Sequence, residues 1–328
     1  MSRFSLTLLV PVVILSTAAV WSGARSPARS SPRDPGRASP SAGCRGRSPT
    51  TPGVSDQTMI SGGVERKFQL TIPQNYDSKK PFPILFGLHP LSISNTFVSG
   101  MTGFADMAPR YNFIGVAPSG RLDGTIPFWL AAPTQDNYDV RFIGDLLDKL
   151  EREMCVDRAR VYSTGMSNGA QMSSLLACRI TNRITAVAPI AGVEFADECR
   201  GRPVPVIAFH GTADPNVAYG GGPGALRGRP DKDWPSVETA VQTWAGRAGC
   251  RTKPARQAIG TEVQRIAYRG CARGADVVLY AVTGGGHTWP GSSIDVPMNG
   301  HVTQDINAAD LMLEFFSQHP PPSKNAKS

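Results

Sequence analysis

The sequence predicts an α/β fold with a mostly parallel central sheet and helices on both of its faces. Two observations predict it. Short apolar runs alternate along the chain with longer amphipathic segments, and several apolar runs are continuous, as in strands that are buried on both faces. Strands separated by helices connect through right-handed crossovers into a parallel sheet. The chain has 328 residues, 41% of them hydrophobic, which is enough for one large domain or two small ones after its ends are set aside.

The expected strands are marked by their apolar runs. VERKFQLTIP at 64–73 alternates as a half-exposed strand does, whereas PFPILFGLH at 81–89 and FIGVAPSG at 113–120 are continuous. Four further strands are expected at 159–165, 184–192, 203–211 and 275–282.

Helices are expected between these strands. The clearest, at 139–154, has apolar residues at helical spacing from Phe142 to Leu150 and charged residues on the opposite face. The others are expected at about 102–111, 168–179, 237–248 and 305–317. The sequence shows no internal repeat and no glycine fingerprint for a dinucleotide or a phosphate.

The first residues have the layout of a secretory signal. Arg3 precedes an apolar run from Phe4 to Trp21, and small residues up to Ala24 offer a cleavage site, so we expect a signal peptide at 1–24. An uncleaved membrane anchor is the alternative, since the run is near the minimum length for a span. In either case we expect the domain to lie outside the cytoplasm, secreted or in the cell envelope.

A segment dense in Ser, Pro, Arg and Gly follows at 25–56. It has no apolar periodicity, so we expect a disordered tether there. Its SAGC string resembles the small residues before a lipid-modified cysteine in bacterial lipoproteins, although Cys44 lies more than twenty residues beyond the apolar run. Lipid attachment at Cys44 therefore stays open. We expect the folded domain at 57–318 and a disordered tail at 319–328.

The formal net charge of +8 is concentrated near the N-terminus. Five of these charges precede residue 57, and only three belong to the rest of the chain. A basic N-terminal tail is suited to contact with an anionic membrane or envelope surface. The folded part has no basic stripe with interleaved aromatic residues, so we expect no nucleic-acid partner.

Six cysteines in an exported chain favour disulfides over metal sites. There is no CxxC pair and no Cys/His cluster with zinc spacing, so we expect no metal. One pair of cysteines brackets the element after residue 167, and another flanks a segment that suits two antiparallel strands. The predicted bridges are Cys178–Cys199 and Cys250–Cys271, with Cys44 and Cys155 unassigned.

The motif GMSNG places one serine at a strand-to-helix turn. The strand expected at 159–165 precedes it and a helix follows it, so Ser167 lies on the turn between Gly165 and Gly169. Glycines at these positions relieve crowding around a strained backbone, and the turn exposes the serine oxygen to the amino end of the helix. Ser167 is therefore the candidate nucleophile, with helix capping as the alternative. The Asn168 N–H is a candidate oxyanion donor.

A serine hydroxyl needs a base, and the base needs an acidic partner that fixes its tautomer. FHGTADPNV places Asp214 just past the strand at 203–211, and GGGHTWPG places His287 just past the strand at 275–282. Ser, Asp and His, each after a different strand, is the chain order of the α/β-hydrolase triad. The reactive groups of parallel sheets gather at the carboxyl ends of the strands, so we predict a triad of these two residues with Ser167.

The other histidines are weaker candidates for the base. His301 and His319 lie in polar or Pro-rich surroundings near the C-terminus, whereas His89 and His210 lie at strand ends, where they suit packing or positioning. Two rival aspartates do not directly follow a strand, namely Asp197 and Asp231.

Three blocks carry a resemblance to a known family. GMSNGAQM, HGTADPNV and GGGHTWPG are similar to the signature blocks of the secreted polyhydroxybutyrate depolymerase and feruloyl esterase-like group of α/β-hydrolases, which includes lipoprotein esterases of mycobacterial type. The match extends from about Gly62 to Phe316. The resemblance implies an exported serine esterase, with Ser167 as nucleophile, Asp214 as acid and His287 as base.

One position departs from the pattern of the family. Relatives have His-Gly at the end of the third strand, whereas this chain has His89, Pro90 and Leu91. Proline has no N–H to donate, so the second oxyanion donor is expected at Leu91. If the loop is remade, only the Asn168 donor remains, and an inactive or narrowly selective relative stays open.

The resemblance implies hydrolysis of carboxylic esters through an acyl-enzyme, without a metal or an organic cofactor. The implied substrates are short hydroxyalkanoate esters or their oligomers, or feruloyl and acetyl esters. His89, Trp129 and Trp289 are candidate residues of the substrate pocket, with ordinary packing as the alternative. Two other functions stay open on the same fold, a non-catalytic envelope binding protein and an acyltransferase. We expect a monomer.

Overall fold

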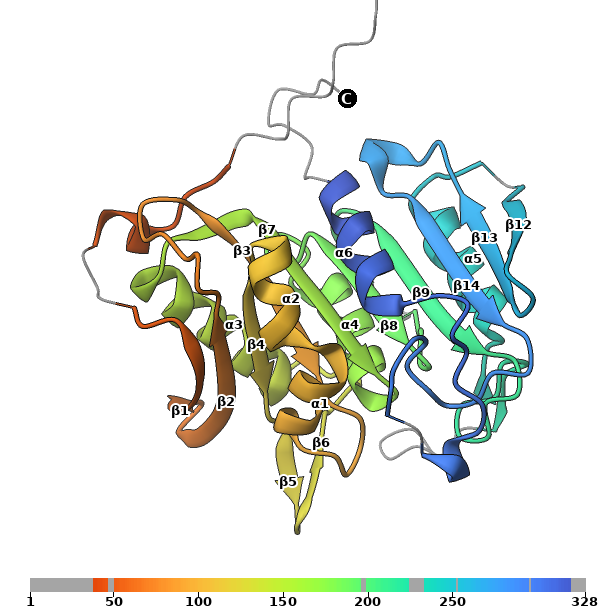
Figure 1. Cartoon of the computed structure of the whole chain (residues 1–328), viewed down its shortest axis with the longest axis horizontal. Helices are drawn as coiled ribbons and strands as arrows, with labels where there is room; N and C mark the ends of the chain where they lie inside the picture. Colours follow the sequence, from red (N-terminus) through yellow and green to blue (C-terminus); the bar gives the residue numbers. More distant parts are fainter. Residues whose placement is uncertain are drawn as a thin grey trace, which may run out of the picture. The chain divides into compact units, whose positions relative to one another are not determined.

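A mixed sheet of ten strands carries the fold in the described part of the chain (Figure 1). The strand order is β1-β2-β4-β3-β7-β8-β9-β14-β13-β12. The computed structural model describes residues 38–46, 50–195, 199–223, 233–251, 253–294 and 296–319, without the side chain of Thr102. The signal peptide predicted at 1–24, the tether before residue 38 and the tail after residue 319 lie outside the described residues.

The six central strands are parallel, which confirms the predicted α/β fold. All residues of five of them are buried, and this is why these strands have continuous apolar sequences. In spatial order the six are β4 (Ile114–Pro118), β3 (Phe82–Leu88), β7 (Val156–Met166), β8 (Ala186–Ile190), β9 (Val206–Gly211) and β14 (Val277–Val282).

Antiparallel strands close both edges of the sheet. β1 (Gly53–Ser61) pairs with β2 (Val64–Ile72) at one edge, and β12 (Ala255–Ile259) pairs with β13 (Val263–Tyr268) at the other. β1 is mostly exposed, so no apolar run marks it in the sequence. Two small hairpins lie outside this sheet, β5 (Arg121–Asp123) with β6 (Ile126–Phe128) and β10 (Gly222–Pro223) with β11 (Asp233–Trp234).

Helices cover both faces of the sheet (Figure 1). One core cluster joins the sheet to α3 (Tyr138–Glu153), α4 (Asn168–Arg179) and α5 (Val237–Arg247), and a second cluster joins the opposite face to α2 (Phe104–Tyr111) and α6 (Ala308–Gln318). The single helix expected near 102–111 is divided, because Gly103 takes a left-handed conformation between α1 (Asn95–Thr102) and α2. Within the described ranges, no helix has both the length and the hydropathy of a membrane span.

Three disulfides are present, and they use all six cysteines of the chain. Two are the predicted pairs: Cys178–Cys199 closes at the end of α4, and Cys250–Cys271 encloses the β12–β13 hairpin. The third joins Cys44 to Cys155. Because its sulfur is used in this bridge, Cys44 is not a site of lipid attachment in this structure.

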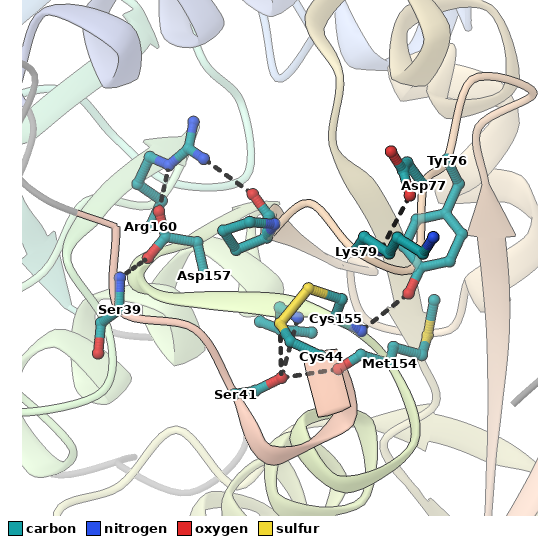
Figure 2. The surroundings of a disulfide bond; sticks show 12 residues. Ser39, Ser41, Cys44, Tyr76, Asp77, Lys79, Met154, Cys155, Asp157 and Arg160 are labelled. Atoms are coloured by element: carbon teal, nitrogen blue, oxygen red, sulfur yellow. Dashed lines mark hydrogen bonds and ion pairs between the residues drawn. A yellow bond between two sulfur atoms is a disulfide. The ribbon is translucent and has the colours of Figure 1, made fainter. Parts of the chain in front are cut away.

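Residues 38–46 are held against the amino end of β7, as Figure 2 shows. Cys44 lies in the short helix η1 (Ala42–Arg45). Just before this helix, Ser41 Oγ donates a hydrogen bond to Met154 O at 2.7 Å and accepts one from Val156 N–H at 3.0 Å. The disulfide and these hydrogen bonds fix the segment at the amino end of β7, whereas the turn at Ser167 follows its carboxyl end.

The tether expected at 25–56 is therefore too long. Residues 38–46 are attached to the domain, with Ser39 N–H donating to Asp157 Oδ1 at 2.8 Å (Figure 2), and β1 begins at Gly53. The sequence does not reveal this attachment, because hydrogen bonds and a disulfide hold the segment instead of buried apolar side chains.

Replacing both Cys44 and Cys155 by serine is expected to lower the free energy of unfolding by about 5 kcal/mol. The bridge joins residues 111 apart in sequence and so restricts the unfolded chain strongly. Denaturant unfolding of the oxidised protein measures the loss. The matched control replaces Cys250 and Cys271, whose bridge spans 21 residues, and is expected to lose about 3 kcal/mol. An unfolding midpoint unchanged by the first replacement contradicts the attachment of this segment.

Candidate active site

β7 turns into α4 at Ser167, whose backbone takes φ 56° and ψ −121°. A positive φ is strained for a residue other than glycine and persists only where the surroundings fix it. Two glycines make room for this turn. A Cβ atom on Gly165 would lie 2.6 Å from Gly169 O, and one on Gly169 would lie 2.2 Å from Leu88 O. The motif GMSNG therefore holds Ser167 at the carboxyl end of β7 by close backbone packing.

Asp214 and His287 come together because they follow β9 and β14, which are neighbours in the sheet. His287 Nδ1 lies 2.8 Å from Asp214 Oδ2, and both side chains are buried. Asp214 Oδ1 accepts the N–H groups of Asn216 and Val217, both at 2.8 Å. An ionised carboxylate only accepts, so Nδ1 of His287 carries the proton and Nε2 of the neutral ring is the basic atom.

His210 is a second histidine beside the same carboxylate. Its Nε2 lies 3.3 Å from Asp214 Oδ2 and 2.9 Å from Val217 O, and it donates because a carbonyl oxygen only accepts. Burial raises the pKa of the Asp214 carboxyl, but the hydrogen bonds from His210 and His287 outweigh burial and hold this pKa below its usual range. Asp214 is therefore ionised at neutral pH. The sequence predicts that His210 lies at a strand end, but the prediction did not include its contact with Asp214. The short spacing of the two residues in HGTAD is the sequence signal that could have indicated this contact.

A cavity of about 360 Å³ lies beside these residues. Ser167 and His287 both line it, together with Leu91 and Trp289. The wall of the cavity is mainly apolar, and most of it comes from the segment that follows β3 and the segment that follows β14. Its further apolar residues are Ile93, Phe97, Met101, Met166, Ile294, Val296 and Met298. The cavity thus brings together the predicted nucleophile, the predicted base and one of the predicted pocket tryptophans.

His89 and Trp129 do not line this cavity, contrary to the expectation from sequence. His89 is fully buried, with Nδ1 donating to Pro90 O at 2.8 Å and Nε2 accepting the Gly120 N–H at 2.9 Å. Trp129 is 1% exposed, and its Nε1–H donates to His89 O at 3.1 Å. The two rings pack against each other, with centroids 5.0 Å apart, so they support the loop that carries Leu91 from within the core.

The buried His89 is expected to make stability depend on pH. Burial lowers the pKa of His89 to about 4 from its ordinary value of 6.5. Between these two values the unfolded chain binds a proton that the folded chain does not bind, so the free energy of unfolding falls as the pH is lowered through this interval, by up to about 3 kcal/mol from this group. Below the folded pKa the contribution is constant.

His89→Gln tests this dependence, because its side-chain amide can accept the Gly120 N–H but does not titrate. Urea unfolding at several pH values is expected to show a shallower loss of stability on acidification for this variant than for the unaltered protein. Parallel pH profiles for the two proteins would show that His89 is not held neutral by burial.

Known proteins resemble this chain in sequence and in fold. The chain is 32% identical over 261 residues to feruloyl esterase D of Neurospora crassa, a match that covers 76% of this chain and 83% of that protein. It is 29% identical over 253 residues to feruloyl esterase C of Emericella nidulans, which covers 72% and 83% of the two chains.

Among solved structures, an acetyl xylan esterase from Aspergillus awamori shares the fold. Its TM-score is 0.58 at 16% sequence identity, over 80% of this chain and 98% of that one. No protein-family model matches the chain. On the strength of the Neurospora crassa relative, the chain belongs to the feruloyl esterase-like family of α/β-hydrolases and is a carboxylic ester hydrolase.

Proposed function

We propose that the protein is a serine esterase with Ser167 as nucleophile, His287 as base and Asp214 as acid. The observation that supports this most directly is the 2.8 Å contact between His287 Nδ1 and Asp214 Oδ2, beside a cavity that Ser167 and His287 both line. The strained backbone of Ser167 is a second support, because strain of this kind gathers at functional sites. An alcohol, an imidazole and a carboxylate at three strand ends of one sheet meet the needs of nucleophilic ester hydrolysis.

In the proposed reaction, His287 Nε2 takes the proton of Ser167 as the serine oxygen attacks the ester carbonyl. The tetrahedral intermediate collapses, the bond to the alcohol oxygen breaks, and His287 gives its proton to the leaving alcohol. Water then attacks the acyl-enzyme with His287 again as base, and Ser167 leaves with the proton as the acid is released. Asp214 stabilises the imidazolium that forms in both halves.

The backbone N–H groups of Asn168 and Leu91 are the proposed donors to the oxyanion. Asn168 is the first residue of α4, where the helix dipole favours negative charge and the N–H has no partner within the helix. Leu91 lines the cavity beside Ser167, and it follows Pro90, which has no N–H. Donors fixed in place before the reaction stabilise a charge that develops only in the transition state.

Feruloyl esters are the proposed substrate class. The two sequence relatives are feruloyl esterases, and the cavity has an apolar wall that includes Trp289. A phenylpropenoyl group buries more apolar area against such a wall than an acetyl group does. Hydroxyalkanoate esters remain the second substrate class, and acyl transfer to a sugar remains the second reaction.

The proposed site of action is outside the cytoplasm. The apolar run and small residues within 1–24 support export. Three disulfides in a chain of this size fit an oxidising compartment.

Ser167→Ala is expected to lower kcat for p-nitrophenyl acetate by at least about 10⁴-fold, because no acyl-enzyme can form. Ser163→Ala is the matched control. Ser163 lies on β7, the strand that leads to Ser167; it is buried and hydrogen-bonds to Ser173 Oγ at 2.8 Å, but it does not line the cavity. We expect this control to retain its kcat. Equal rates for Ser167→Ala and the unaltered protein would remove Ser167 as the nucleophile.

The value of kcat/KM is expected to be about tenfold or more higher for methyl ferulate than for acetylated xylan or hydroxybutyrate oligomers, because the aromatic acyl group buries more apolar area. Trp289→Ala is expected to narrow this difference. If hydroxybutyrate oligomers have the highest kcat/KM of these substrates, the feruloyl assignment is contradicted. Transfer products in excess of free acid, with a sugar acceptor present, would instead make the protein an acyltransferase.

A further inference from the structure

The segment 127–130 makes hydrogen bonds to both of the loops that carry the proposed oxyanion donors. It runs from the end of β6 toward α3 and is not part of the main sheet. One of the two loops follows β3 and carries Leu91, and the other is the turn into α4 at Asn168. The contacts on each side show what this segment holds in place.

On the side of β3, two hydrogen bonds enclose Leu91. Trp129 Nε1–H donates to His89 O at 3.1 Å, and Ser92 N–H donates to Pro127 O at 3.0 Å. Ser92 takes a positive φ of 66°, which its surroundings have to fix. Because one bond lies two residues before Leu91 and the other lies one residue after it, they set the direction of the peptide that carries the Leu91 N–H.

On the side of α4, the Asn168 side chain binds both backbone groups of Trp129. Asn168 Oδ1 accepts the Trp129 N–H at 2.7 Å, and Asn168 Nδ2 donates to Trp129 O at 3.0 Å. All of these atoms are buried. Trp129 is thus joined through its indole to one donor loop and through its backbone to the residue that carries the other donor.

The segment is itself fixed by polar groups at the start of α3. Leu130 N–H donates to Asp139 Oδ2 at 2.8 Å, and Asn137 Nδ2 donates to Leu130 O at 2.5 Å. Asp139 in turn forms a buried ion pair with Arg66 at 2.6 Å. The side chains of Arg66 and Asp139 are almost wholly buried, so their ion pair fixes the carboxylate that accepts the Leu130 N–H.

We propose that Trp129 is a positioning residue that fixes the Leu91 and Asn168 N–H groups relative to one another. The inference rests on the proposed function, in which these groups bind the oxyanion. Gly169 packs closely against the backbone of Leu88 and His89, and such packing restricts the distance between the two loops but has no preferred direction. Hydrogen bonds through Trp129 supply the direction. Since the oxyanion is absent from the bound substrate and forms only in the tetrahedral intermediate and the transition states on either side of it, releasing Trp129 should lower kcat and leave substrate binding unchanged.

Trp129→Phe is the first test, because it keeps an aromatic ring in the core and removes the Nε1–H donor to His89 O. With p-nitrophenyl acetate we expect kcat to fall by about 10- to 100-fold and KM to change by less than about twofold. The matched control is Trp244→Phe, which removes a buried indole donor to Glu194 O at 2.9 Å outside the cavity. We expect Trp244→Phe to lose about as much thermal stability as Trp129→Phe and to keep its kcat.

Asn168→Ala is the second test, since it keeps the backbone N–H and removes the two bonds to Trp129. If Trp129 acts on both donors together, the losses in kcat from Asn168→Ala and Trp129→Phe are expected to be less than multiplicative in the double variant. Fully multiplicative losses, an unchanged kcat in Trp129→Phe, or equal kcat losses in Trp129→Phe and Trp244→Phe would each overturn the inference. Failure of the proposed function is distinguishable, because Ser167→Ala would then retain the activity of the unaltered protein.

Discussion

The close approach of α4 to the end of β3 is the constraint on which the rest of the site depends. Because Gly165 and Gly169 have no side chains, the first turn of the helix reaches the Leu88 carbonyl, and Ser167 takes a positive φ between the two glycines. This single contact sets the exposure of the serine oxygen and aims the amino end of α4 at it. It also brings Gly169, the residue after Asn168, against the backbone of Leu88 and His89, just before Leu91. A Cβ atom at either glycine would displace the helix and with it all of these groups.

The electrostatics of the site depend on a carboxylate that is kept ionised in the core. Asp214 loses contact with water, and two backbone N–H groups and two histidines replace the lost hydrogen bonds. These bonds favour the charged form more than burial opposes it. In the proposed reaction, this negative charge is therefore already beside the imidazole when His287 takes the proton of Ser167.

The sequence predicts the central strands and the three triad candidates for the same reason. Strands buried on both faces have continuous apolar runs, and Asp214 and His287 come three and five residues after the ends of two such strands. Ser167 directly follows β7, which is buried in its second half. The pocket residues are not predictable in this way, because the exposure of a side chain to the cavity depends on how loops that are distant in sequence pack over one another. Trp129 is covered through contacts with residues about forty positions away in sequence. The attachment of 38–46 leaves no local pattern either, since its bridge closes over 111 residues.

The buried ion pair of Arg66 and Asp139 orients neighbouring groups through directional hydrogen bonds, and this explains its place in the core better than a gain in folding stability does. Burial raises the pKa of the Asp139 carboxyl in spite of Arg66, so desolvation opposes the charge of this pair. Apolar side chains of similar volume would fill the same space at lower cost, but they tolerate small shifts of their neighbours. A carboxylate held by Arg66 has fixed oxygen positions, and one of them fixes the Leu130 N–H beside Trp129. The polar network thus lies under the loops of the two proposed oxyanion donors, where a misplacement of about 1 Å would lower the rate of the proposed reaction.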